Sequence, residues 1–187
     1  EIGSGLVGSE MCIRDSIYPV WDWTRIPGTT AIGNQDKTSL EGYQIGNNEF
    51  GGGVSDGVNG IIAYKGKYNE LQANKAYFFF DNMMFCIGSD ISYVQNDNVL
   101  TSVEQNLLNG EVIYNDGQEK QLSSNSNMQL KQLKWVYHNN TGYIFRGTDN
   151  VTIQNMSQAG SWKDINATGE SLSLIHISEP TRPEPIS

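Results

Sequence analysis

The sequence has few of the residues on which many kinds of functional site depend. Its 187 residues include two cysteines, two histidines, five prolines and only 12 lysines and arginines together. The 12 basic residues are outnumbered by 21 aspartates and glutamates, so the formal net charge is -9. A nucleic-acid-binding face needs clustered lysine and arginine, and no apolar run here has the length of a membrane helix. We therefore expect neither a nucleic-acid partner nor a membrane partner.

The two ends of the chain are related to each other at the level of codons. Codons compatible with residues 10–16, read as their reverse complement, encode residues 172–177, and the match continues outward on both sides. Protein physics gives no reason for such a relation, whereas a sequencing adapter ligated to both ends of one DNA fragment would produce it. We interpret residues 1–16 and 172–187 as adapter-derived and leave them out of fold reasoning. The native segment is then residues 17–171.

Leaving out the two ends shortens the inventory of reactive groups further. Cys86 and His138 become the only cysteine and the only histidine, so no disulfide can form within the segment. The ends hold five carboxylates and two arginines, which leaves the native segment at a net charge of -6. Attraction to an anionic polymer would therefore need a local basic patch and could not come from the overall charge.

Short alternating or apolar runs, separated by Asn, Asp and Gly, predict β structure throughout. A segment of this size fits one domain or part of one, and the pattern is typical of a large antiparallel sandwich. We expect 123–127 to be an exposed loop and 81–82, 115–117 and 139–142 to be hairpin turns. Strands are expected at 60–64, 71–80, 83–87, 99–105, 112–114, 135–137 and 143–145.

The run at residues 17–30 reads IYPVWDWTRIPGTT. If it is extended, its alternation places Trp21 and Trp23 on one face of a strand and Asp22 on the other. Two tryptophans on one face could stack on sugar rings or fill a core, and the residues alone favour the core.

Three further features have structural interpretations. Cys86 lies in an apolar run and is expected to be a small core residue. His138 stands beside a predicted turn without a nucleophile or paired carboxylates, and is expected to be structural or at the surface. The glycines at 51–53 lack the Lys-Ser/Thr of a phosphate loop and more simply permit a bulge or a close backbone approach.

Five blocks of the chain stand out in order, at 17–30, 48–57 (NEFGGGVSDG), 71–81 (LQANKAYFFFD), 105–110 and 158–166. In this order they resemble the central β domain of family 8 polysaccharide lyases, nearest to the chondroitin AC type. Any one of them is a weak signal, but together they cover nearly all of the native segment. The resemblance implies an all-β fold, a fragment of the large antiparallel β super-sandwich that is galactose-mutarotase-like.

The resemblance also implies a function. Members of this family cleave uronic-acid-containing polysaccharides by β-elimination, with a tyrosine, a histidine and an asparagine at the reacting centre. These residues lie upstream of the first block in the family, so we assign no catalytic residue to this chain and expect it to be inactive alone. The expected partners are an anionic polysaccharide substrate and the missing α/α toroid and C-terminal β domain of the same protein. An extracellular or periplasmic location is expected on the same basis.

Two alternatives stay open. The chain could be a non-catalytic carbohydrate-binding or structural β module, or part of a xanthan or hyaluronate lyase within the same enzyme family. The resemblance suggests one substrate contact, Tyr43, although Gly42 occupies the strictly aligned position and an exposed loop tyrosine is an equally good interpretation. A calcium-like acidic cluster of the family is matched by Asp22 but not by Thr24 or Gly33. Because a hard cation needs several oxygen ligands, we expect no metal and no other cofactor.

Overall fold

The computed structural model describes the following residues: 17–33, 47–68, 70–95, 98–147, 150–160 and 175–176. The chain folds as two compact units, one of residues 22–105 and one of residues 1–21 and 106–187. In the described part, one short 3-10 helix accompanies fourteen strands, all paired antiparallel. The elements are η1 (Tyr18–Val20), β1 (Thr30–Ile32), β2 (Asn47–Ser55), β3 (Gly60–Tyr68), β4 (Leu71–Phe80), β5 (Met83–Ser92), β6 (Val99–Thr101), β7 (Ile113–Asn115), β8 (Glu119–Gln121), β9 (Ser126–Leu130), β10 (Trp135–His138), β11 (Thr141–Ile144), β12 (Val151–Asn155), β13 (Ala159–Gly160) and β14 (Ile175–His176). The all-β prediction is confirmed.

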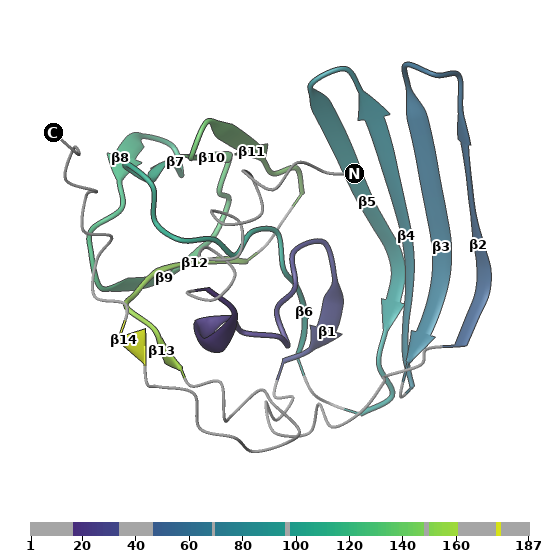
Figure 1. Ribbon diagram of the computed structural model, residues 1–187, viewed down its shortest axis with the longest axis horizontal. Coiled ribbons are helices and arrows are strands. Elements are labelled where there is room, and N and C mark those ends of the chain that lie inside the picture. The colour runs from purple at the N-terminus through teal and green to yellow at the C-terminus, as the bar shows by residue number, and fades with distance from the viewer. Residues whose placement is uncertain are drawn as a thin grey trace, which may run out of the picture. The chain divides into compact units, whose positions relative to one another are not determined.

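Unit 22–105 is built on a four-stranded meander with the order β2-β3-β4-β5 (Figure 1). The β4–β5 hairpin closes with Phe80 opposite Met83, so the predicted two-residue turn at Asp81-Asn82 is confirmed. Asp81 has a φ of 49°, a left-handed conformation that Asp tolerates better than most residues. A bulge in β5, opposite the stretch between Gln72 and Asn74, interrupts the pairing near the far end of the hairpin.

Side chains alternate between two faces of this sheet because successive strand residues point to opposite sides. One face, here called the tyrosine face, holds Lys75, Tyr77 and Phe79 of β4, and pairing adds Tyr64 and Cys86 from the neighbouring strands. The opposite, apolar face has a row of directly paired residues running across all four strands. That row is Val54, Ile61, Phe78 and Phe85.

The short pair β1–β6 belongs to the same unit, with Thr30 opposite Thr101. The predicted strand 99–105 is therefore real but ends at Thr101. β1 lies against β4, and the Tyr77 hydroxyl donates a hydrogen bond of 2.8 Å to the carbonyl oxygen of Gly28. This bond ties the Pro27-Gly28 turn of the opening motif to the tyrosine face.

The other unit has a small hydrophobic core between two sheets, β11-β10-β7-β8 and β12-β9. Both hairpins predicted here are confirmed, since β7 pairs with β8 and β10 pairs with β11. η1 lies against β13, which pairs with β14. The buried core residues are Val112, Tyr114, Leu122, Leu130, Leu133 and Val136, with Met128, Tyr143, Phe145, Val151 and Ile153 packed around them.

Several strands are absent from the sequence-based prediction. β2 contains three consecutive glycines, which disfavour a strand locally, but pairing with β3 overrides that preference. The loop predicted at 123–127 is shorter than expected, because β9 begins at Ser126 and pairs with β12. Among the described residues, no helix is long and apolar enough to span a bilayer.

Candidate functional site

The opening motif is not a strand, so the predicted placement of its two tryptophans on one strand face is wrong. Trp21 has no regular secondary structure, and Trp23 and Thr24 form a turn. The Asp22 carboxylate causes the change of direction: its Oδ1 accepts hydrogen bonds from the backbone amide (3.1 Å) and the hydroxyl (2.6 Å) of Thr24. Arg25 N also donates to the Asp22 carbonyl at 2.9 Å, which completes a β-turn. Both tryptophans are half-buried.

Gln105 fixes this turn from 83 residues away in the sequence. Its Oε1 accepts a hydrogen bond of 2.7 Å from the Asp22 amide. Its Nε2 donates to the carbonyl oxygens of Asp22 (3.0 Å) and Arg25 (3.2 Å). One side-chain amide therefore satisfies three backbone groups of the opening motif, which have no strand partner to pair with.

Arg25 holds the other end of the motif. Its Nη2 donates a hydrogen bond of 2.7 Å to the carbonyl oxygen of Gly33, just after β1. The Nη1 atom of the same guanidinium is enclosed by protein without a hydrogen-bond partner. The arrangement is structural, because the guanidinium closes a loop of the chain.

The described residues around Asp22 do not fit the calcium-like acidic cluster found in the family that this chain resembles. Thr24, at one of the ligand positions, is a donor to Asp22, and at Gly33 only a backbone carbonyl is present, which already accepts from Arg25. No group of three or more possible metal ligands occurs in the described part of the chain. A hard cation needs more oxygen ligands than these positions supply.

Tyr43, the proposed substrate contact, lies outside the described residues, and its role stays a prediction. The block that follows it begins in β2. A bulge at Glu49 shifts the register between Asn48 and Phe50, so the predicted bulge lies just before the glycines. At Gly53 a Cβ atom would stand 2.7 Å from the carbonyl oxygen of Ile61. The predicted close backbone approach is therefore confirmed at this glycine.

The β2–β3 turn satisfies its own polar groups. Asp56 Oδ1 accepts hydrogen bonds from the amides of Val58 (2.8 Å) and Asn59 (2.6 Å), and these bonds lower the pKa of Asp56 to about 2. The Ser55 hydroxyl donates to the Asn59 carbonyl at 2.8 Å and accepts from the Gly57 amide at 3.0 Å. Gly57 has a φ of 92°, where glycine is favoured. The polar side chains at this tip of the sheet are therefore already engaged in hydrogen bonds within the turn.

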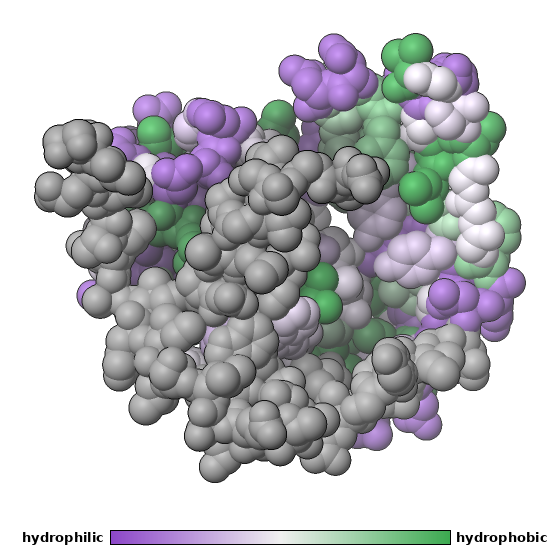
Figure 2. Space-filling model, in the orientation of Figure 1, coloured by the Kyte–Doolittle hydropathy of each residue, from purple (hydrophilic) through white to green (hydrophobic). Residues whose placement is uncertain are grey.

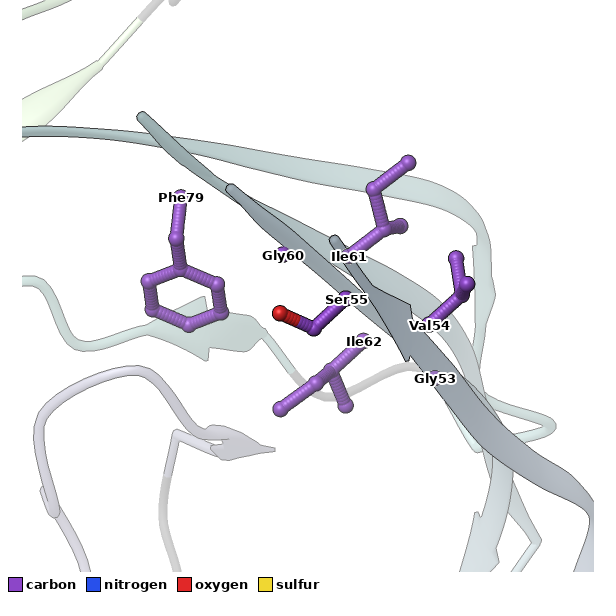
Figure 3. Close-up of a pocket in the computed structure, with 7 residues that line it drawn as sticks. All are labelled: Gly53, Val54, Ser55, Gly60, Ile61, Ile62 and Phe79. Atoms are coloured by element: carbon purple, nitrogen blue, oxygen red, sulfur yellow. The ribbon is translucent and has the colours of Figure 1, made fainter. Parts of the chain in front are cut away.

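An apolar hollow lies beside this tip. Figure 3 shows Phe79, Ile62 and Ser55 on one side of the strands and Ile61 and Val54 on the other. The only side-chain hydroxyl in its lining is that of Ser55, which is already bonded within the turn. Sugar recognition needs polar groups beside the aromatic surface, so this lining fits an apolar side chain better than a saccharide.

Two predictions about single residues have opposite outcomes. His138 is 5% exposed, and its Nε2 accepts a hydrogen bond of 3.2 Å from the amide of Asn109. The structural interpretation of this histidine is confirmed. Cys86 is exposed, so its assignment to a core is wrong. It lies on β5, at the edge of the four-stranded sheet, where all ten residues are exposed.

Comparison with known proteins decides the family. Residues 14–176 match the family model for the super-sandwich domain of polysaccharide lyase family 8. This chain belongs to polysaccharide lyase family 8. It is 39% identical over 154 residues to a chondroitinase-AC of Pedobacter heparinus, which covers 81% of this chain and 22% of that protein. It is 25% identical over 159 residues to a hyaluronate lyase of Staphylococcus aureus, covering 82% of this chain and 20% of that protein.

A solved structure supports the same assignment. A chondroitinase AC lyase, solved in complexes with oligosaccharides, matches with a TM-score of 0.67 and 33% identity, over 82% of this chain and 23% of that one. The family resemblance inferred from the five blocks is confirmed, as is the fragment of a super-sandwich as the fold. The family 8 chain described here spans about a fifth of the length of the curated relatives that it matches.

Proposed function

We propose that this chain is part of a polysaccharide lyase that cleaves uronic-acid-containing glycosaminoglycans, chondroitin and possibly hyaluronan, by β-elimination. The observation that carries the proposal is the 39% identity to a chondroitinase-AC across 154 residues, against 25% to a hyaluronate lyase. In this reaction a base removes the proton at C5 of the uronate, the C4–O bond breaks, and the leaving oxygen takes up a proton.

Within that enzyme we propose that this segment supplies a wall of the cleft and structural support, and that it is inactive alone. The polar side chains of its family blocks support this role because they bond to the chain itself. Asp22 and Gln105 hold the opening turn, and Asp56 holds the β2–β3 turn. The catalytic groups, the toroid and the C-terminal β domain would come from other parts of the protein, and Tyr43 stays the proposed substrate contact. The protein would act outside the cytoplasm.

The experiment is to recover the DNA upstream of residue 17, express the complete reading frame, and assay it with chondroitin, hyaluronan and xanthan. Elimination creates a double bond conjugated to the uronate carboxylate, so product formation raises the ultraviolet absorbance. We expect the fastest rise with chondroitin. A folded complete protein that gives no rise with any uronate polymer would favour the alternative, a carbohydrate-binding or structural β module.

A further inference from the structure

Lys75 stands out on the tyrosine face because it is a charged residue that is almost fully covered. It lies in the middle of β4 and is only 7% exposed. Within the described part of the chain no carboxylate pairs with it and no hydrogen bond to its amine is formed. Burial lowers the pKa of Lys75, because a charged amine is less stable away from water. A covered cation without an opposite charge is unusual in a folded protein.

The side chain of Lys75 leads toward β5. Lys75 is directly opposite Gly88, and Tyr77 is directly opposite Cys86, so Lys75 and Cys86 are diagonal neighbours on one face. Gly88 leaves room for the lysine stem: the Cδ and Cε atoms of Lys75 lie 3.8 Å and 3.9 Å from the point where a Cβ atom of residue 88 would be. The stem therefore crosses over Gly88 onto the strand that carries the thiol.

The amine at the end of that stem lies on the same face of the sheet as the thiol of its diagonal neighbour. Burial lowers the pKa of the Lys75 amine, and the electrostatic interaction with Cys86 raises it and so opposes the effect of burial. Among the residues that the structure describes, the polar side-chain atoms that are enclosed without a partner are Arg25 Nη1 and Asn74 Oδ1. The Lys75 amine is not among them, and the Cys86 thiol is exposed.

We propose that Cys86 and Lys75 together form a modification site for anionic thiol-reactive compounds, such as disulfides that carry carboxylates. The Cys86 thiolate attacks one sulfur of the disulfide, a new S–S bond forms, and the second half of the reagent leaves as its thiolate. The Lys75 ammonium keeps its proton throughout. It attracts the carboxylates of the incoming reagent. The site is independent of the lyase function proposed above.

A purely structural role for Lys75 predicts something different. If its stem only covers Gly88, the charge has no influence on reagents that reach the exposed thiol. The two accounts are separated by charge selectivity, which is the rate with a dianionic aromatic disulfide divided by the rate with a neutral dipyridyl disulfide. The neutral reagent reports on access to Cys86, so a change in folding alone alters both rates and leaves their ratio unchanged.

The test uses the whole 187-residue chain with Cys12→Ser, which leaves Cys86 as its single thiol. We expect Lys75→Met to lower the ratio about 3- to 10-fold, the effect of one charge at short range near a protein surface. Lys65→Met is the matched control, because Lys65 lies on the opposite face of the sheet in an ion pair of 2.6 Å with Glu49. Lys65→Met should leave the ratio within about 1.5-fold of the parent.

Two further measurements keep the proposal testable if Lys75→Met fails to fold. Lys75→Arg retains the charge and should retain the ratio. High salt should lower the ratio of the parent chain without any substitution, because screening weakens the attraction. The proposal is overturned by a ratio that is insensitive to salt, or by a ratio that Lys75→Met and Lys65→Met change equally. Mass spectrometry of the product should show the single adduct on Cys86.

Discussion

Single side chains hold the opening motif of this family 8 segment in place where backbone pairing does not. Asp22 turns the chain by bonding to Thr24, and Gln105 bonds to three backbone groups of that turn. None of this could be predicted from the sequence. The alternation of Trp21, Asp22 and Trp23 indicates a strand, whereas the contact that prevents it comes from 83 residues further along. The burial of Lys75 over Gly88 likewise depends on strand register and not on local pattern.

Replacing Gln105 tests the first of these contacts. Gln105→Ala removes an acceptor and two donors from the turn and should lower the free energy of unfolding by about 1–3 kcal/mol. Gln105→Glu keeps the acceptor but loses both donors, so it should also be destabilising. Asn106→Ala is the control and should cost less, since within the described residues the Asn106 side chain accepts a single hydrogen bond, from the amide of its neighbour Leu107. Chemical denaturation of the four proteins measures the differences, and equal costs for Gln105→Ala and Asn106→Ala would count against the assigned role.

Tyr77 gives a prediction with a pH dependence. Burial raises its pKa to about 12, and its hydroxyl donates to Gly28. Since the folded pKa exceeds the unfolded value of about 10, this tyrosine stabilises the fold fully below pH about 10. That contribution is lost as the pH rises through about 12. Tyr77→Phe should cost about 1 kcal/mol at neutral pH and should make the alkaline loss of stability shallower.

Thermal melts between neutral pH and about pH 11 check both parts of the tyrosine prediction. Tyr137→Phe is the matched control, because Tyr137 is exposed and its hydroxyl forms one hydrogen bond in the described part of the chain, to Asn140 at 3.2 Å. It should change neither the neutral stability nor the alkaline slope. The same slope in Tyr77→Phe and in the parent would show that another group titrates.

At the scale of elements, hairpins with strong turn signals were the easiest to predict. Leu71–Phe80 matches β4 residue for residue, because an apolar run and the Asp81-Asn82 turn agree about where the strand ends. β2 was missed because its glycines carry no strand signal, and its existence depends on β3. The prediction that Cys86 is a core residue is wrong for a related reason. An apolar run predicts a strand, but it does not tell an edge strand from a central one.

The edge position of β5 has a consequence for handling the protein. Its ten residues contain neither Lys nor Pro, and Met83, Phe85 and Ile87 are more than half exposed. Figure 2 shows hydrophobic side chains at the surface on the right of the view, where the strands of this sheet lie. Exposed apolar edges of this kind pair with other chains. We therefore predict poor solubility for the isolated segment 17–171.

A single charge on the β5 edge should improve the solubility of the segment. Phe85→Lys places a lysine in the middle of β5 and should raise the soluble concentration several-fold, because edge lysines oppose strand pairing. Val58→Lys adds the same charge at an exposed turn position, away from the β5 edge, and should have little effect. Light scattering at matched concentrations compares the two. Equal improvement in both would mean that net charge, and not the β5 edge, limits solubility.

At the scale of the whole molecule, the sequence sufficed for the family and the class of fold. Five blocks in order carried that assignment, and the match over residues 14–176 confirms it. The site was much less predictable. Its proposed sugar contact, Tyr43, lies outside the described residues, and the catalytic groups are expected upstream of residue 17. The chain spans about a fifth of its curated relatives, so what remains to be tested is how the chemistry is divided along the protein.

The most direct test of that division compares the complete reading frame with the isolated segment 17–171 under identical conditions. Both are incubated with chondroitin at equal molar concentration, and the ultraviolet absorbance of the unsaturated uronate product is followed. We predict a steady rise with the complete protein and none with the segment, even when circular dichroism shows that the segment is folded as β structure. Unsaturated product from the segment alone would contradict the account, because the reacting groups would then lie within it.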